Sequence, residues 1–482
     1  MAALWTCTLL CGVLAATVAQ ATFSTPAVLI LGPEVIKERL TQELQDHNAT
    51  AVLQQLPLLS AMREESSRRS FLLSGLLDTI LRHVVWLKIT SASIPQLQLQ
   101  LSAQDQELVV KIPLDLVAGL NTPLVKSMVE LHLQSEVQAH VTATASPAGP
   151  ALLVLSDCFN RQGSLRISLL RKLSFSTNLI EKQVTSLLMP ALPRLVKTQL
   201  CPVIQAAFED TYAGFLRLVR APIPLSPGGL LFDLLSSAIE DSAIQLNLQA
   251  KLLDSQREVT NWLNDTSASL AVPALGSAPF SFVLRQDVLN AVVAALFPPG
   301  KLAVQLDYVL PDLAGELKSG IKGINEQAAG KLDRTQLVKL QTRKTPQLLL
   351  SQGGAQATQL IVLDLFPTNK AQRPLFTLGI EAKSEAQFYL QGDRLALNFN
   401  NISIDRIKLM NSDMKLFNPE LLKDILSRIL ESTLLSTENG KLRTGIPMLM
   451  VKALGYESAT LSLTTDALVL TPADSNSPVS CC

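Results

Sequence analysis

Apolar and polar side chains alternate with a period of two along several stretches of the first half of the chain. Gln and Leu take turns over residues 96–101, and the alternation returns over residues 129–133 and 137–143. Because successive side chains of a strand point to opposite faces of a sheet, this pattern is typical of strands with one buried and one solvated face. We therefore expect long antiparallel strands in this half.

A first helix is expected before these strands. Pro33 suits the first helical position, and Glu34 places an acid in the first turn, where it interacts favourably with the helix dipole. The apolar face of this helix, at helical spacing, consists of Val35, Ile36, Leu40 and Leu44.

A second helix is expected after the strands. It begins near Asn178, which can cap the helix together with Glu181 three residues later. Pro190 and Pro193 are expected to kink or break it, and the chain then continues helically toward Cys201. The apolar stripe of this helix consists of Leu179, Ile180, Val184, Leu187 and Leu188.

The best linker in the sequence is residues 221–229, Ala-Pro-Ile-Pro-Leu-Ser-Pro-Gly-Gly. Prolines stiffen this segment and two glycines end it. We predict an N-terminal domain over residues 22–220, a C-terminal domain over residues 230–472 and a flexible tail over residues 473–482.

The order of elements repeats after the linker. Strands are expected at residues 244–252, 360–366, 386–390, 395–399, 461–463 and 467–470. One helix is expected at residues 288–296, and another is opened by Asn418, Pro419 and Glu420. The inner face of this last helix consists of Leu421, Leu422, Ile425, Ile429 and Leu430. Both halves thus combine helices with several long strands, without a residue-by-residue repeat.

The composition narrows the classes of function. Apolar residues make up 48% of the 482 residues and aromatic residues 5%, so Leu, Val, Ile and Ala must build the cores. Such side chains suit an apolar channel for lipid as well as an ordinary core. The 41 basic and 41 acidic residues cancel, which argues against a nucleic-acid partner and against a strongly cationic surface.

The first 21 residues predict a signal peptide and therefore secretion. A short apolar stretch around Leu9–Ala16 ends at Ala19-Gln20-Ala21, a small-x-small cleavage pattern, although no Lys or Arg precedes it. A membrane anchor is the competing interpretation, but the segment is too short to span a bilayer comfortably.

Cysteines and glycosylation motifs fit a secreted chain. Cys158 and Cys201 are the natural intradomain pair, and closing that loop contributes about 4 kcal/mol in the chain-entropy model. Adjacent Cys481 and Cys482 cannot easily bond each other, so they either cross-link chains or have no role. Three Asn-x-Ser/Thr motifs predict surface glycan acceptors at Asn48, Asn264 and Asn401.

No pattern of catalytic or metal-ligating residues emerges from the sequence. The histidines are confined to the first 140 residues, at positions 47, 83, 132 and 140, and no two of them have the spacing of a zinc-binding helix. Gly-x-Ser-x-Gly, phosphate-binding loops and dinucleotide fingerprints are absent. We predict no catalytic residue, no metal and no cofactor, and hence a protein that is not an enzyme.

Several segments resemble one known family. They are residues 27–44 (AVLILGPEVIKERLTQEL), 56–62 (LPLLSAM), the stretch ending in Cys158, 198–204 (TQLCPVI) and 379–389 (GIEAKSEAQFY). These segments closely resemble long PLUNC proteins of the bactericidal/permeability-increasing (BPI), lipopolysaccharide-binding and PLUNC superfamily. The chain departs from that pattern in its Arg-rich segment near residue 66 and at its terminal cysteines.

The resemblance implies an α+β fold shaped like a boomerang. Two elongated domains, each a twisted antiparallel sheet or barrel wrapped on long helices, would be joined by a central sheet. The family disulfide falls on Cys158 and Cys201. Relatives hold acyl chains in apolar grooves between helix and sheet, and the resemblance implies lipopolysaccharide binding and damping of the inflammatory response in airway and oral secretions.

Physical considerations make such a groove possible, since each buried lipid methylene contributes about 0.8 kcal/mol. We predict lipopolysaccharide or phospholipid acyl chains as partners, with transient contact to a membrane or micelle surface. Alternatives are a lipid-transfer shuttle and a surface-active mucus protein. The predicted groove-lining residues, for each of which an ordinary core role is the alternative, are Leu179, Val184, Leu187, Leu188, Leu422, Ile425 and Ile429.

Overall fold

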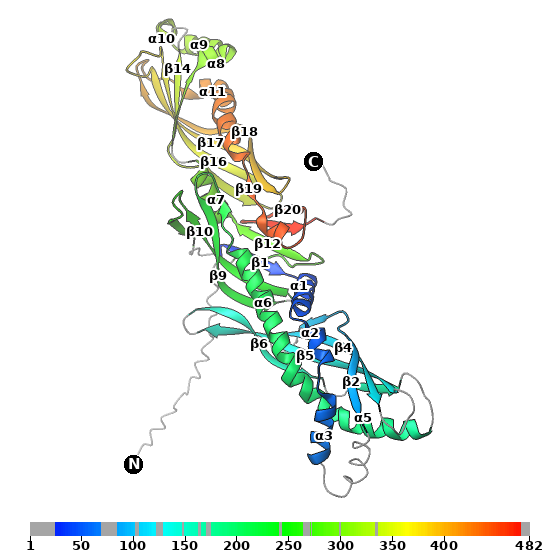
Figure 1. Cartoon of the computed structure of the whole chain (residues 1–482). Coiled ribbons are helices and arrows are strands. Elements are labelled where there is room, and N and C mark those ends of the chain that lie inside the picture. The colour runs from blue at the N-terminus through cyan, green and yellow to red at the C-terminus, as the bar shows by residue number, and fades with distance from the viewer. Residues whose placement is uncertain are drawn as a thin grey trace, which may run out of the picture.

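The computed structural model shows an elongated molecule whose two halves lie end to end (Figure 1). It describes residues 25–68, 84–101, 106–121, 129–146, 149–161, 165–169, 175–240, 243–263, 270, 272–297, 300–332 and 336–473. The predicted signal peptide, Asn264, Cys481 and Cys482 lie outside these residues.

The N-terminal half contains a six-stranded antiparallel sheet with the order β2-β4-β5-β6, in which β3 pairs with β4 and β7 with β5. Its longest strand buries alternate side chains, such as Leu131 and Leu133 in β5, as the sequence pattern predicted. The strands are β2 (Trp86–Ser93), β3 (Gln98–Leu101), β4 (Leu108–Asn121), β5 (Val129–Ser146), β6 (Gly149–Asn160) and β7 (Arg166–Leu169).

Helices pack against the apolar face of this sheet (Figure 1). They are α1 (Pro33–Asp46), α2 (Ala49–Gln54), α3 (Leu58–Arg68), α5 (Phe175–Leu195), the π-helix η1 (Val196–Leu200) and α6 (Cys201–Val219). Pro190 and Pro193 lie inside α5 without ending it. The interruption comes instead at η1, where Figure 1 shows α5 and α6 meeting at an angle.

A central sheet takes strands from both ends of the chain. Its order is β20-β21-β12-β1-β10-β9-β8, with β11 paired to β10. The bounds are β1 (Ala27–Leu31), β8 (Ile223–Pro224), β9 (Gly229–Glu240), β10 (Ala243–Leu253), β11 (Val259–Leu263), β12 (Phe280–Arg285), β20 (Ala459–Thr464) and β21 (Ala467–Pro472). Because β1 pairs with both β10 and β12, this sheet holds the start of the chain against strands that follow residue 229.

The predicted linker forms a tight turn at the edge of the central sheet. Its β8 pairs with β9, and the Ser226–Pro227 peptide bond is cis. The Leu225 amide donates to the Gly228 carbonyl at 3.0 Å. Gly228 has a φ of +92°, and a Cβ there would lie 2.1 Å from the Leu253 carbonyl oxygen, so this position requires glycine. The division into two domains at this turn stays a prediction.

The C-terminal half repeats the architecture with a seven-stranded sheet of order β13-β14-β16-β17-β18-β19, in which β15 pairs with β16. The strands are β13 (Lys301–Gln305), β14 (Leu337–Thr342), β15 (Gln347–Ser351), β16 (Gly354–Phe366), β17 (Phe376–Gln391), β18 (Arg394–Ser412) and β19 (Ile446–Pro447). The α+β prediction of two curled sheets around helices, joined by a central sheet, is confirmed.

The helices of the C-terminal half lie against its sheet and at its far end (Figure 1). They are α7 (Gln286–Leu296), α8 (Leu306–Val309), α9 (Pro311–Ile324), α10 (Glu326–Lys331), the 3-10 helix η2 (Pro419–Leu422), α11 (Lys423–Leu430), the π-helix η3 (Glu431–Leu435), α12 (Ser436–Leu442) and α13 (Leu449–Ala453). The helix predicted to open at Asn418 is present, and the Asn418 side chain caps it by accepting from the Glu420 amide.

Candidate functional site

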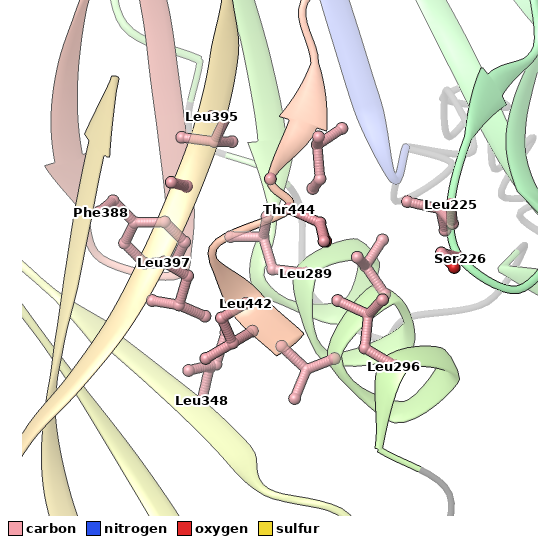
Figure 2. Close-up of a pocket in the computed structure, with 15 residues that line it drawn as sticks. Leu225, Ser226, Leu289, Leu296, Leu348, Phe388, Leu395, Leu397, Leu442 and Thr444 are labelled. Atoms are coloured by element: carbon pink, nitrogen blue, oxygen red, sulfur yellow. The ribbon is translucent and has the colours of Figure 1, made fainter. Parts of the chain in front are cut away.

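Two adjoining apolar cavities lie where the C-terminal sheet meets the central sheet. The first, shown in Figure 2, has a cavity volume of about 30 Å³, and the second, beneath the central sheet, about 40 Å³. Residues common to both linings are Leu289, Val292, Leu395 and Ile446. The two cavities are therefore neighbouring parts of one apolar region.

The walls of the first cavity come from elements far apart in sequence. In Figure 2, Phe388 and Leu397 of the C-terminal sheet face α7, whose Leu289 and Leu296 point toward them. The turn after β8 closes another side with Leu225. The remaining lining residues are Ser226, Val292, Val293, Leu348, Leu395, Ala396, Leu442, Thr444, Gly445 and Ile446.

The second cavity lies against the inner face of the central sheet. Phe232 of β9 and Phe282 of β12 meet edge to face with ring centroids 5.5 Å apart, and both line the cavity. The segment from β19 into α13 supplies Met448, Leu449, Met450 and Val451 on the opposite side.

Polar contacts fix α7 beside the cavities. Asn290 accepts from the Leu348 amide at 2.6 Å and donates to the Leu348 carbonyl at 3.2 Å, and Gln286 accepts from the Leu350 amide at 2.6 Å. These bonds satisfy backbone groups on the free side of β15. The polar face of α7 is thus used for attachment, which leaves its apolar face to line the cavities.

The chemistry of both linings is that of hydrocarbon. Among the described residues that line them, none carries an ionisable side chain, and the hydroxyls of Ser226 and Thr444 are the side-chain polar groups. An apolar cavity of this kind excludes water and takes up apolar ligands. Among the described lining residues, no acid or base lies beside the Ser226 and Thr444 hydroxyls that could activate them as nucleophiles.

Comparison with known proteins identifies the family. The model of the N-terminal domain of the LBP / BPI / CETP family matches residues 43–211 of this chain, and the model of the family's C-terminal domain matches residues 324–473. Human BPI fold-containing family B member 1 is 59% identical over the full length of both chains, and the mouse protein is 57% identical over 98% of this chain and 100% of its own. The chain belongs to the LBP / BPI / CETP family. The resemblance predicted from the sequence is confirmed.

A solved structure shares the fold of this LBP / BPI / CETP family member. The crystal structure of lipopolysaccharide binding protein matches with a TM-score of 0.51 and 14% sequence identity, covering 93% of this chain and 98% of that one. At this identity the likeness concerns the fold alone. No helix among the described residues is long and apolar enough to cross a membrane.

The predicted groove-lining residues lie elsewhere in this family member. Val184, Leu187 and Leu188 are buried in α5, and Leu422 and Ile429 are buried beside α9 and β18. Ile425 is half-buried, and the side chain of Leu179 is outside the described part of α5. None of the six described side chains lines either cavity, so their contact with lipid stays a prediction.

Sequence reasoning found the elements around the cavities but not their role. The helix at 288–296 and the strand at 395–399 were both predicted, and both line the first cavity. The sequence feature that could have indicated the cavity is the apolar character of α7, because every side chain of α7 that lines the first cavity is aliphatic. No local pattern showed that the turn at Leu225 and the segment around Ile446 would meet this helix.

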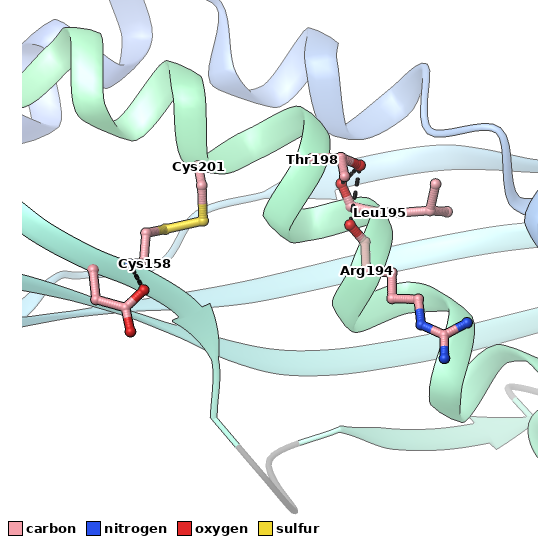
Figure 3. The surroundings of a disulfide bond; sticks show 6 residues. Cys158, Arg194, Leu195, Thr198 and Cys201 are labelled. Carbon is pink, nitrogen blue, oxygen red and sulfur yellow. Dashed lines mark hydrogen bonds between the residues drawn. A yellow bond between two sulfur atoms is a disulfide. The ribbon is translucent and has the colours of Figure 1, made fainter.

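The predicted disulfide between Cys158 and Cys201 is present and is confirmed (Figure 3). It joins β6 to the first residue of α6, with 5.9 Å between the two Cα atoms. Figure 3 also shows Thr198, whose hydroxyl donates to the Arg194 and Leu195 carbonyls at 3.0 and 3.2 Å. The disulfide therefore holds the sheet against the helix directly after η1.

The described histidines each lie against a carboxylate side chain. His132 contacts Asp115, and His140 lies 3.1 Å from Glu107. His47 Nε2 lies 2.8 Å from Asp210 Oδ2, and these two side chains come within 4.8 Å of a Glu43 carboxylate oxygen. This group joins α1 to α6 at the exposed surface, away from the residues that line the cavities. The prediction of no metal site stays a prediction.

Proposed function

We propose that this protein is a secreted, non-catalytic lipid-binding protein of mucosal innate defence. It holds acyl chains of lipopolysaccharide or phospholipid in the apolar cavities between α7, β18 and the central sheet. Binding the lipid modulates the host response to it. Headgroups remain near the surface, where the protein makes transient contact with a membrane or micelle.

The observation that carries this proposal is the hydrocarbon lining of the two adjoining cavities. Aliphatic and aromatic side chains from α7, β12, β17, β18 and α13 surround narrow gaps in the packing, which an acyl chain would enter by displacing these side chains. Each methylene of an acyl chain that enters such a space contributes about 0.8 kcal/mol. The same fold is found in a protein named for binding lipopolysaccharide, which supports the choice of ligand.

Filling the cavities tests the proposal. Val292 lines both cavities, so Val292→Phe places a ring where lipid methylenes would lie. Excluding about three methylenes costs about 2.4 kcal/mol of binding, a loss of roughly 60-fold in affinity. Titration with a fluorescent fatty acid or phospholipid measures this loss directly.

The matched control is Ala295→Phe on the same helix. Ala295 is half-buried and lines neither cavity, so the same ring introduced there leaves lipid affinity unchanged. If both variants bind the probe as tightly as the unmodified protein while keeping its circular dichroism, acyl chains do not occupy these cavities and the proposal is wrong.

A further inference from the structure

The outer edge of the C-terminal sheet is formed by β18. This strand pairs with β17 along its whole length, but on its other side β19 pairs with Arg394 and Leu395 alone. From Ala396 to Ser412 the described residues supply no strand partner on that side. A long unpaired edge is a template for pairing with a second chain, and natural proteins cover or interrupt such edges.

Asn401 interrupts this edge. The register between β17 and β18 shifts there, since Lys383 pairs with Ser403 and Glu385 with Asn400, which makes a bulge. Asn401 has a φ of 52° and an exposed side chain, and it opens the Asn-Ile-Ser glycosylation motif. The structure thus places a glycan acceptor on the unpaired edge itself.

The side-chain amide of Asn401 is positioned by β17. Its Nδ2 donates to Glu385 Oε2 at 2.9 Å. A primary amide carries two hydrogens, and N-glycosylation replaces one of them, so the remaining N–H can keep this bond. The hydrogen bond to Glu385 is therefore compatible with a sugar on the same nitrogen.

A polar cleft of about 490 Å³ adjoins Asn401 between β18, η3 and α12. On its floor, Asn439 accepts from the Phe399 amide and donates to the Phe399 carbonyl, both at 2.8 Å, which ties α12 to the strand edge. The residues lining the cleft are Phe399, Asn400, Asn401, Glu431, Leu435, Ser436, Asn439, Gly440 and Arg443.

We propose that this cleft holds the first sugars of an N-glycan on Asn401 and that the glycan keeps the edge of the C-terminal sheet from pairing with a second molecule. N-acetylglucosamine presents hydroxyl and acetamide groups. The Glu431 carboxylate accepts from hydroxyls, the Arg443 guanidinium donates to carbonyl oxygens, and Ser436 does both. The apolar cavities of the proposed function share no lining residue with this cleft.

The glycan on Asn48 provides the matched comparison. Asn48 is also exposed and has a φ of 53°, but it precedes the short helix α2 and lies on no strand. Both motifs would be processed in the same secreted protein. A difference in glycan occupancy or release rate between Asn48 and Asn401 therefore reflects the structure around each asparagine and not the cell that made the protein.

The first test is glycopeptide mass spectrometry of the full-length protein secreted from mammalian cells, followed by timed digestion with an endoglycosidase under native conditions. We expect Asn401 to carry a glycan and the enzyme to release it about tenfold more slowly than the glycan on Asn48. A tenfold slower release is what one to two net hydrogen bonds between the cleft and the sugars would cause. After denaturation the two rates become equal. An empty Asn401, or equal rates in the native protein, overturns the assignment of the cleft.

The second test removes the motif while keeping Asn401. Ser403→Ala removes the glycan from Asn401 and leaves the edge of β18 uncovered. We expect this variant to self-associate as its concentration rises, as measured by size-exclusion chromatography with light scattering. Thr50→Ala, which removes the glycan from Asn48, stays monomeric. Ser403→Lys also removes the glycan but places a charge on the edge, and it restores the monomer. A monomeric Ser403→Ala at every concentration overturns the protective role of the glycan, and lipid loading of each variant shows separately that its cavities are intact.

Discussion

At the scale of single residues, the clearest departure from an aliphatic core is a buried carboxyl group. Glu438 of α12 is buried against β16, where its Oε2 accepts from Gln359 Nε2 at 2.8 Å. Burial raises the pKa of Glu438 from 4.5 to about 7, and the hydrogen bond from Gln359 and the charge of Lys441 counteract this rise in part. The Ser384 hydroxyl is also buried and has no hydrogen-bond partner among the described residues.

This pKa shift predicts a pH-dependent stability. A raised pKa means that the folded state binds the Glu438 proton more tightly, so the stabilisation is complete below pH 4.5 and is lost as the pH rises through about 7. Glu438→Gln keeps a neutral side chain at every pH. The variant is therefore more stable than the unmodified protein at pH 8, by about 3 kcal/mol, and no more stable at pH 4.

Urea denaturation at both pH values measures the difference, and Glu457→Gln at an exposed position serves as the control. An equal effect of Glu438→Gln at pH 4 and pH 8 contradicts the assignment of a buried, titrating carboxyl group.

At the scale of helices and strands, regular sequence patterns predicted the elements with the clearest periodicity, and strands such as β4 and β12 were missed. Alternation located β3 and β5, and helical spacing located α1, α7 and the helix opening at Asn418. The strand β1 was missed because its five apolar residues show no alternation. Ala27, Leu29 and Leu31 face the main core while Val28 and Ile30 face a second cluster, so both faces of β1 are buried.

The position of the cavities could not be predicted from the sequence, because no local pattern shows which distant segments meet. Their walls combine residues near 225, 289, 348, 395 and 446, and pairing of these segments is set by the whole sheet topology. The sequence also pointed to α5 and α11 as groove walls, because an apolar helical stripe looks the same whether it faces a core or a ligand. Residues such as Leu188 and Ile429 lie buried among other side chains.

The attachment of α7 to β15 gives a prediction at this scale. Asn290→Ala leaves the Leu348 amide and carbonyl without their side-chain partner, which costs about 2 kcal/mol of unfolding free energy and loosens one wall of the first cavity. Asn290→Asp keeps the acceptor and costs less. Denaturant unfolding measures both variants, and an Asn290→Ala protein as stable as the Asp variant would show that these bonds do not hold the helix.

At the scale of the whole molecule, the central sheet couples the two halves. It places β1, from the start of the described chain, between β10 and β12, and it ends with β20 and β21 from the other end. The apolar cavities adjoin this sheet, so lipid bound there contacts strands contributed by distant parts of the sequence. The 41 basic and 41 acidic residues give this assembly no net charge.

The neutral charge and the uncharged linings predict a weak effect of salt on lipid binding. If acyl-chain burial dominates, the affinity for lipopolysaccharide changes by less than about threefold between 50 and 500 mM salt, because screening acts on charges and not on hydrocarbon contacts. Binding isotherms at the two salt concentrations measure this. A steep fall in affinity with salt would instead assign the binding energy to headgroup charges.

The central claim is that the protein carries lipid in its apolar cavities, and the lipid content of the secreted protein tests it most directly. Mass spectrometry of an organic extract, beside that of an unrelated secreted protein and the Val292→Phe variant, measures what co-purifies. We predict phospholipid or fatty acid in stoichiometric amount from the unmodified protein and much less from the variant. An extract as empty as that of the unrelated protein, together with failure to load a fluorescent lipid, would contradict the claim.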